Sequence, residues 1–226
     1  MTTAFGIEYN HGIVMAADTK LTIGSKKEIN ERKIFFGRDG YFAFSYAGIL
    51  KEPIIFCRDR LRKAEPRKVL KSLSSGILDR IQHANAKNCV DSESQNFDIT
   101  RQVNFIFATR YKAIENLFIP LPQLYRVYPA GRAYLRIWDG IGSGRDLALT
   151  TINQRLKNKE KNQRNLSIVL RTALEALENA VSHDSGSEGY NMAIITSEKI
   201  ISFYEFFQEK FRFNLEAISE QIKAKI

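Results

Sequence analysis

The first residues of the chain have the side chains needed for nucleophilic chemistry. The sequence begins Met-Thr-Thr, and a strand-like run over residues 3–9 follows directly. If Met1 is removed, Thr2 carries a hydroxyl and a free α-amine, whose unperturbed pKa is about 8. The amine is then partly neutral near pH 7 and can act as the base that activates the hydroxyl, without a histidine. While Met1 is attached, Thr2 has no free amine and should be inactive.

Local geometry brings a carboxylate to this terminus. Residues 3–9 and 13–17 are strand-like runs separated by the letters NHG, which are typical of a hairpin turn. With a loop of two or three residues, paired residue numbers sum to about 21 or 22, so Thr2 lies beside Asp18. A lysine nearby would favour deprotonation of the amine and hydroxyl, and an aspartate would hold that lysine in place. Lys33 is one candidate among 34 basic residues, and spacing alone does not single it out.

The elements that must position these residues alternate between strands and helices. A helix is expected between Leu50 and Lys63, another after Pro66 whose apolar stripe reaches Ile81, and a polar loop over residues 87–98. A second helical block covers residues 145–156 and 165–183. Strands are predicted at 3–9, 13–17, 33–37, 41–48, 102–111, 124–129, 132–142, 190–196 and 200–206. Hairpins grouped between helix pairs predict an α+β fold with antiparallel sheets and helices outside.

Length and composition favour one domain with a tail. The chain has 226 residues, 44% of them hydrophobic, which is enough for a sizeable core. We expect a domain over residues 1–206 and a C-terminal tail over residues 207–226. The tail is predicted to be an amphipathic helix that covers a subunit surface or docks a partner, with its apolar side at Phe211, Leu215, Ile218 and Ile222.

Composition also argues against several kinds of site. Cys57 and Cys89 lie in no metal-binding spacing, and the histidines are scattered, so neither a zinc site nor a histidine triad is expected.

No apolar run is long enough to span a bilayer and no secretion signal is present, so we expect a cytoplasmic protein without a membrane partner. The net charge is +9, but the basic residues are dispersed. The denser runs at 58–63 and 157–164 favour a solvated surface over a docking patch for protein or RNA.

Five segments give the chain a resemblance to a known family. They are TTAFGIEYNHGIVMAADTKLTIGS, KIFF, YAG, GIGSG and HDSGSEGYNMAIIT, in this order. From Thr2 to about Phe206 the chain resembles the β-type subunits of the proteasome, including their bacterial two-component relatives, within the N-terminal nucleophile hydrolases. The resemblance implies a four-layer αββα sandwich of two antiparallel sheets with helix pairs outside.

The resemblance also implies roles for particular residues. Thr2 would be the nucleophile, Asp18 the orienting carboxylate and Lys33 the charge that lowers the local pKa. The supporting polar cluster would be Ser143, Asp184 and Ser187, and the Gly48 N–H would be the oxyanion donor. The interval before Lys33 is one residue shorter than in the family, so this assignment requires a deletion there.

Substrate binding follows from the same resemblance. An extended peptide would pair with the backbone near Thr22 and Gly48. The first specificity pocket would be built by Leu21, Glu31, Phe35 and Tyr46, and the tyrosine would make it shallow.

The implied function is that of a threonine endopeptidase. Thr2 would cleave peptides or unfolded proteins through an acyl ester, inside a self-compartmentalised homo-oligomeric ring or together with proteasome subunits. No metal or organic cofactor is needed, and a ring-shaped AAA+ ATPase partner is implied by the resemblance alone.

Two alternatives stay open at this point. The same acyl-enzyme could be resolved by an amine, which would make the protein a peptide ligase. A catalytically silent scaffold or nucleic-acid-binding subunit could instead keep the fold and use the +9 charge. Analysis of the products formed with an added amine distinguishes a ligase from a protease. RNA binding that is sensitive to salt and independent of Thr2 would favour the scaffold or nucleic-acid-binding subunit.

Overall fold

The chain opens with the hairpin that its sequence predicts. In the computed structural model, which describes residues 3–23, 27–30, 32–48, 52–90, 96–115, 117–182 and 189–206, β1 (Thr3–Tyr9) runs antiparallel to β2 (Gly12–Asp18). A two-residue turn joins them. Ala4 lies opposite Ala17, which is the smaller of the two expected registers and confirms the predicted hairpin.

Two antiparallel five-stranded sheets form the centre of the molecule. The first has the order β12-β1-β2-β13-β14 and the second the order β11-β10-β7-β6-β5. The first sheet adds β12 (Trp138–Gly142), β13 (Gly189–Thr196) and β14 (Ile200–Phe206) to the hairpin. The second contains β5 (Phe35–Phe36), β6 (Phe42–Ala47), β7 (Asn104–Thr109), β10 (Gln123–Val127) and β11 (Ala133–Arg136).

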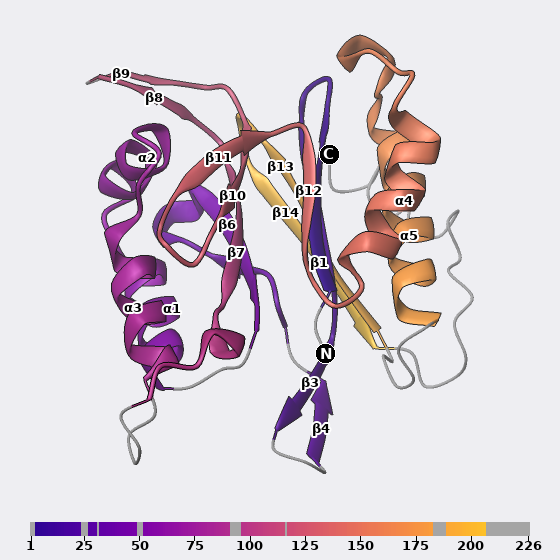
Figure 1. Cartoon of the computed structure of the whole chain (residues 1–226). Coiled ribbons are helices and arrows are strands. Elements are labelled where there is room, and N and C mark those ends of the chain that lie inside the picture. The colour runs from indigo at the N-terminus through magenta and orange to yellow at the C-terminus, as the bar shows by residue number, and fades with distance from the viewer. Residues whose placement is uncertain are drawn as a thin grey trace.

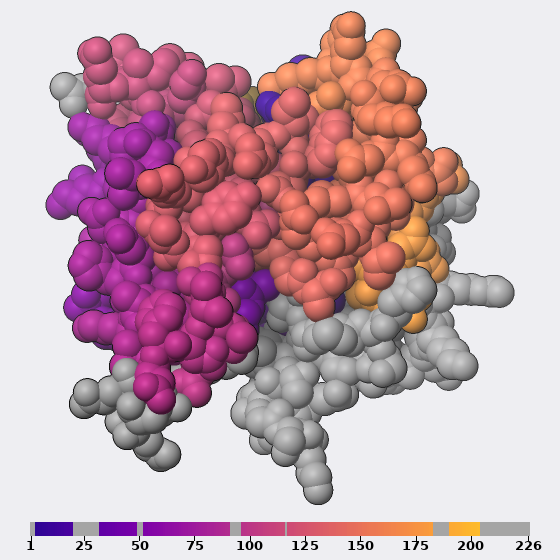
Figure 2. All heavy atoms as spheres, viewed as in Figure 1, coloured from indigo at the N-terminus to yellow at the C-terminus, as the bar shows by residue number. Residues whose placement is uncertain are grey.

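Within the residues that the structure describes, five α-helices pack against these sheets. They are α1 (Glu52–Lys63), α2 (Pro66–Ser74), α3 (Asp79–Cys89), α4 (Arg145–Leu156) and α5 (Leu166–Ser182). Figure 1 shows α1, α2 and α3 beside the second sheet, and α4 and α5 beside the first sheet, with the two sheets facing each other. The space-filling view has the same arrangement, with purple atoms of the first helical block on one side and orange atoms of the second on the other (Figure 2).

Three clusters of buried side chains hold these parts together. One packs α4 and α5 against the first sheet, and a second packs α1, α2 and α3 against the second sheet. The third lies where the sheets face each other and includes Ala17, Ile34 and Ile106. Successive strand residues point to opposite faces, so the apolar runs of β2 and β7 fill a core on each side.

Short elements complete the described part of the chain. Two small sheets, which the sequence does not predict, pair β3 (Lys20–Ile23) with β4 (Lys27–Asn30) and β8 (Lys112–Ile114) with β9 (Leu117–Ile119). The 3₁₀ turns are η1 (Arg38–Gly40), η2 (Ile99–Arg101) and η3 (Lys161–Gln163).

The structure corrects three predicted elements. The apolar stripe after Pro66 is shared by two helices, because Gly76 has a φ of +82° and Ile77 forms a bridge to Arg132. The polar loop predicted over 87–98 begins after residue 89, because α3 reaches Cys89. The strand predicted over 132–142 divides between β11 in one sheet and β12 in the other. The predicted tail helix over 207–226 lies outside the described residues.

Candidate active site

The structure brings Asp18 and Lys33 into direct contact. Asp18 is the last residue of β2, and Lys33 lies in the segment that leads to β5. Lys33 Nζ donates to Asp18 Oδ2 at 2.7 Å, and the two residues are only 6% and 3% exposed. The shorter interval before Lys33 therefore still allows its side chain to reach the carboxylate.

The second oxygen of the same carboxylate binds the start of β1. The Thr3 amide N–H donates to Asp18 Oδ1 at 2.7 Å. Burial raises the pKa of Asp18, while the Lys33 ammonium and the Thr3 amide oppose that rise by stabilising the charged form. Removing one partner of such a buried pair leaves an uncompensated charge, so the two groups depend on each other.

Thr3 is a site residue that the sequence does not single out. Its Oγ1 accepts a hydrogen bond of 3.2 Å from the amide of Gly144, the residue before α4. A Cβ atom at Gly144 would lie 2.2 Å from this oxygen, so only glycine fits. Thr3 thus ties β1 to both β2 and the start of α4. A second threonine next to Thr2 was the available signal, but a hydroxyl alone does not reveal its partner.

Asn191 is a second residue that sequence reasoning missed. It is 2% exposed on β13, and its Oδ1 accepts hydrogen bonds from the amides of Lys33 at 3.0 Å and Ile34 at 2.7 Å. The signal available in the sequence was an amide side chain inside the apolar run YNMAII. Buried polar side chains are normally hydrogen-bonded, but the sequence does not show to what.

The structure also describes two other predicted site residues, Gly48 and Ser143. Gly48 follows β6 with a φ of +142°, and a Cβ atom there would lie 2.5 Å from the carbonyl oxygen of Gln102. Only glycine is therefore accommodated at this position. Ser143 is exposed in the turn between Gly142, which pairs with Thr3, and Gly144, which binds its hydroxyl.

The predicted specificity residues are described only in part. Phe35 and Tyr46 stack with ring centroids 5.3 Å apart and an interplanar angle of 3°. Both pack on the face of the second sheet that α1 covers. Leu21 and Thr22 belong to β3, and their side chains lie outside the described residues, as do Met1, Thr2, Glu31, Asp184 and Ser187.

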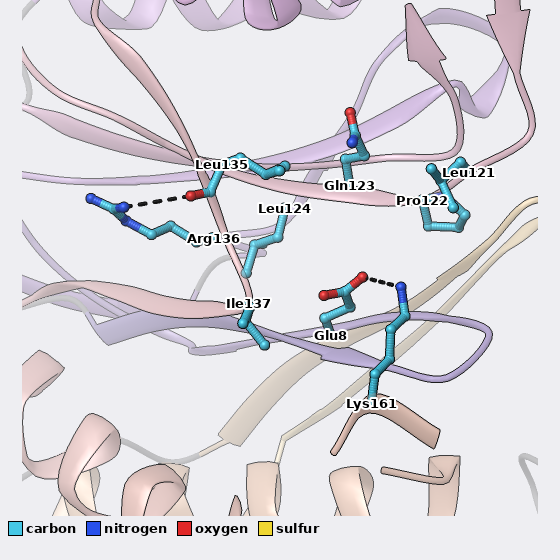
Figure 3. A pocket seen from close by; sticks show the side chains of 9 residues that line it. All are labelled: Glu8, Leu121, Pro122, Gln123, Leu124, Leu135, Arg136, Ile137 and Lys161. Carbon is cyan, nitrogen blue, oxygen red and sulfur yellow. Dashed lines mark hydrogen bonds and ion pairs between the residues drawn. The ribbon is translucent and has the colours of Figure 1, made fainter. Parts of the chain in front are cut away.

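A pocket of about 160 Å³ lies near the opposite end of β1. Glu8 and Lys161 lie side by side in its lining and form an ion pair, and Leu124 and Ile137 supply apolar walls (Figure 3). Since Thr3 and Glu8 are at opposite ends of the strand, this pocket is separate from the cluster around Asp18.

Membrane-spanning helices and metal-binding clusters are both absent from the described part of the chain. No helix there combines the length and apolar character needed to cross a bilayer. Across the described ranges, no three His, Cys, Asp or Glu side chains gather in a way that could hold a metal ion.

Comparison with known proteins bears on the fold. No protein-family model and no curated protein matches the sequence. The structure is similar to that of a Gly-1 mutant of Anbu from Hyphomicrobium sp. strain MC1, with a TM-score of 0.66 and 15% sequence identity. The similarity covers 100% of this chain and 96% of that chain. At this identity, the chain shares the fold of that structure, and its chemistry has to be argued from its own side chains.

Proposed function

We propose that the protein is an N-terminal threonine protease with Thr2 as its nucleophile. The observation that carries the proposal is the buried contact between Asp18 and Lys33, which Thr3, the residue next to Thr2, joins through its own amide. A charge pair of this kind is costly to bury, and perturbed buried charges are concentrated at functional sites. Thr2 directly precedes Thr3 in the sequence, which supports its assignment to this site.

The proposed reaction runs in two stages. With Met1 removed, the Thr2 α-amine takes the hydroxyl proton as the oxygen attacks the scissile carbonyl carbon. The Gly48 N–H stabilises the oxyanion, and the proton passes to the leaving amine as the peptide C–N bond breaks. Water then attacks the resulting ester, releases the acid and returns the proton to the Thr2 oxygen. The positive charge of Lys33, held by Asp18, keeps the α-amine in its neutral form.

The supporting assignments are part of the same proposal. Ser143, Asp184 and Ser187 would surround the amine and the water that carries its proton. We assign the two sheets and their helices to the four-layer αββα sandwich of N-terminal nucleophile hydrolases, with residues 1–206 as the domain and 207–226 as the tail. The similarity to the Anbu structure supports this assignment at the level of the fold.

We further propose that the active form is a self-compartmentalised ring. Three exposed apolar side chains, on β9, on β11 and just after β11, support an interface with other subunits, because such side chains are costly to leave in water. They are Leu117, Leu135 and Ile137, which are 68%, 57% and 49% exposed. Partner subunits and an AAA+ ATPase belong to the same proposal.

Replacement of Lys33 tests the central assignment. In the protein with Met1 removed, Lys33→Met should lower the rate of peptide hydrolysis by on the order of 100-fold, because the charge that sets the protonation of the amine is lost. Lys161→Met is the matched control, since it removes a lysine from an ion pair at the other end of β1. It should leave the rate within about twofold. Circular dichroism verifies folding, and equal rates for folded Lys33→Met and wild type would contradict the proposal.

A further inference from the structure

Asn191 lies at the point where the first sheet meets the segment that carries Lys33. It sits on β13 directly after Tyr190, which is paired with Asp18 across the sheet, and Asn191 itself is opposite Ala17. Residues alternate between the faces of a strand, so Asn191 shares a face with Ala193 and Ile195. Those two residues belong to the cluster between the sheets, and that cluster also contains Ile34.

Both ends of the Asn191 side chain bind backbone groups. Its carbonyl oxygen accepts from the amides of Lys33 and Ile34, and its Nδ2 donates to the carbonyl of Phe203 at 3.2 Å. The two amides therefore depend on a side chain 157 or more positions away in sequence. A buried amide without a partner is costly, so these bonds hold the segment in one place.

This arrangement ties the two members of the ion pair to neighbouring strands of the first sheet. Asp18 ends β2, and Asn191 holds the Lys33 backbone to β13, the neighbour of β2. A long lysine side chain has several rotatable bonds, and a fixed backbone limits where its ammonium group can go. In the 2.7 Å contact, β2 therefore positions Asp18, and Asn191 of β13 positions the backbone of Lys33.

We propose that Asn191 is a positioning residue, which holds the Lys33 backbone so that the ammonium group stays against Asp18. The proposal rests on the proposed function of the Asp18–Lys33 pair. Asn191 acts through Lys33, and it needs no contact with substrate. The side chain has to supply an acceptor for two amides and a donor as well, which alanine, valine and aspartate do not.

Asn85 provides a matched control within the same chain. It is 3% exposed on α3, and its side chain also makes three hydrogen bonds to the backbone, one to Ile81 and two to Val103. It belongs to the helices beside the second sheet, and its bonds hold Val103, which lies beside Gly48, whereas Asn191 holds Lys33. Asn85→Ala and Asn191→Ala should therefore lower stability to a similar degree.

The first measurement is amide hydrogen exchange, which does not depend on activity. In Asn191→Ala, the amides of Lys33 and Ile34 should exchange about tenfold faster than in wild type, because they lose their acceptor. In Asn85→Ala, exchange at these two amides should not change. Unchanged exchange at Lys33 and Ile34 in Asn191→Ala would overturn the proposal, even if the protein turned out to have no protease activity.

The second measurement is the steady-state kinetics of peptide hydrolysis by the processed proteins. Asn191→Ala should lower kcat by about tenfold and leave KM within about twofold, because the catalytic charge is misplaced while the peptide still binds. Loss of the Lys33 charge from its place should also shift the pH dependence of kcat to higher pH in Asn191→Ala, because the α-amine then stays protonated to higher pH. Asn85→Ala, which acts on Val103 beside Gly48, should leave that pH dependence unchanged. If both variants show the same pH dependence of kcat, Asn191 does not act through Lys33 and the proposal is wrong. An inactive wild type would instead contradict the proposed function and leave the exchange result standing.

Discussion

A single carboxylate connects the residues around the candidate site. Asp18 uses one oxygen for the Thr3 amide and the other for the Lys33 ammonium, both at 2.7 Å. A buried ion pair contributes little net stability, because the loss of hydration offsets the attraction between the charges. The stability gained from this pair is therefore small, which is in keeping with the chemical role proposed for it.

Glycine at position 144 is required by the same cluster. The Gly144 amide donates to Thr3 Oγ1, and a side chain there would collide with that oxygen. The Gly-Ile-Gly-Ser-Gly segment thus does more than form a tight turn before α4. It allows the first turn of a helix to approach the strand that begins at Thr3.

Tyr9, at the far end of β1, makes stability depend on pH in the alkaline range. Burial raises its pKa from 10.0 to about 12. Between these values the unfolded chain has released the phenolic proton and the folded chain has not. The unfolded state then binds fewer protons, so the free energy of unfolding should fall by up to about 1.4 kcal/mol per pH unit.

Urea unfolding from pH 9 to pH 12 measures this effect when wild type is compared with Tyr9→Phe. The difference between the two proteins should be constant below pH 10 and should shrink or reverse above it, because phenylalanine has no proton to lose. Parallel curves across the whole range would contradict the prediction.

At the scale of elements, a second buried carboxylate fastens β12 to its neighbours. Asp139 is 5% exposed and lies 3.6 Å from Arg126 of β10 and 3.2 Å from Arg145 of α4. Arg126 also donates to the Gly140 carbonyl, and its other terminal nitrogen donates to Asn104 of β7 at 3.0 Å. This network joins both sheets and the start of α4, next to the turn that binds Thr3.

Removing that carboxylate should therefore be costly. Asp139→Ala should lower the free energy of unfolding by about 3–5 kcal/mol, because it leaves a buried arginine without its counter-charge. Asp146→Ala is the control, since Asp146 also pairs with Arg145 but its side chain is 89% exposed, and it should cost less than about 1 kcal/mol. Chemical denaturation of both variants provides the comparison, and similar losses would mean that the network does not stabilise the fold.

Local patterns made several elements predictable, and long-range pairing limited the rest. The hairpin of β1 and β2 follows from a short turn between two apolar runs, so Asp18 could be placed from sequence. Lys33 could not be placed from spacing, because its position depends on Asn191, far along the chain. The run over 132–142 reads as one strand because both halves suit a sheet, but no local signal shows that they join different sheets. Likewise, Ile77 ends the α2 stripe by bridging to Arg132, a tertiary contact.

At the scale of the whole molecule, the two sheets support the candidate site from separate sides. The first sheet supplies Thr3, Asp18 and Asn191, while the second is preceded by Lys33 and contains the strand that Gly48 follows. The buried cluster between the sheets includes Ala17 and Ile34, the neighbours of Asp18 and Lys33 in the chain. Packing between the sheets therefore helps to set the distance between the backbones of Asp18 and Lys33, across which their side chains form the ion pair.

The central claim is that Thr2 becomes a reactive N-terminal nucleophile. The most direct test is the intact mass of the purified protein before and after exposure to a β-lactone or epoxyketone, with Thr2→Ala as the control. If Thr2 is the nucleophile, wild type should lose Met1 and gain a single adduct, and the variant should gain none. A chain that retains Met1 and gains no adduct, or an adduct that also forms on Thr2→Ala, would mean that Thr2 is not the nucleophile.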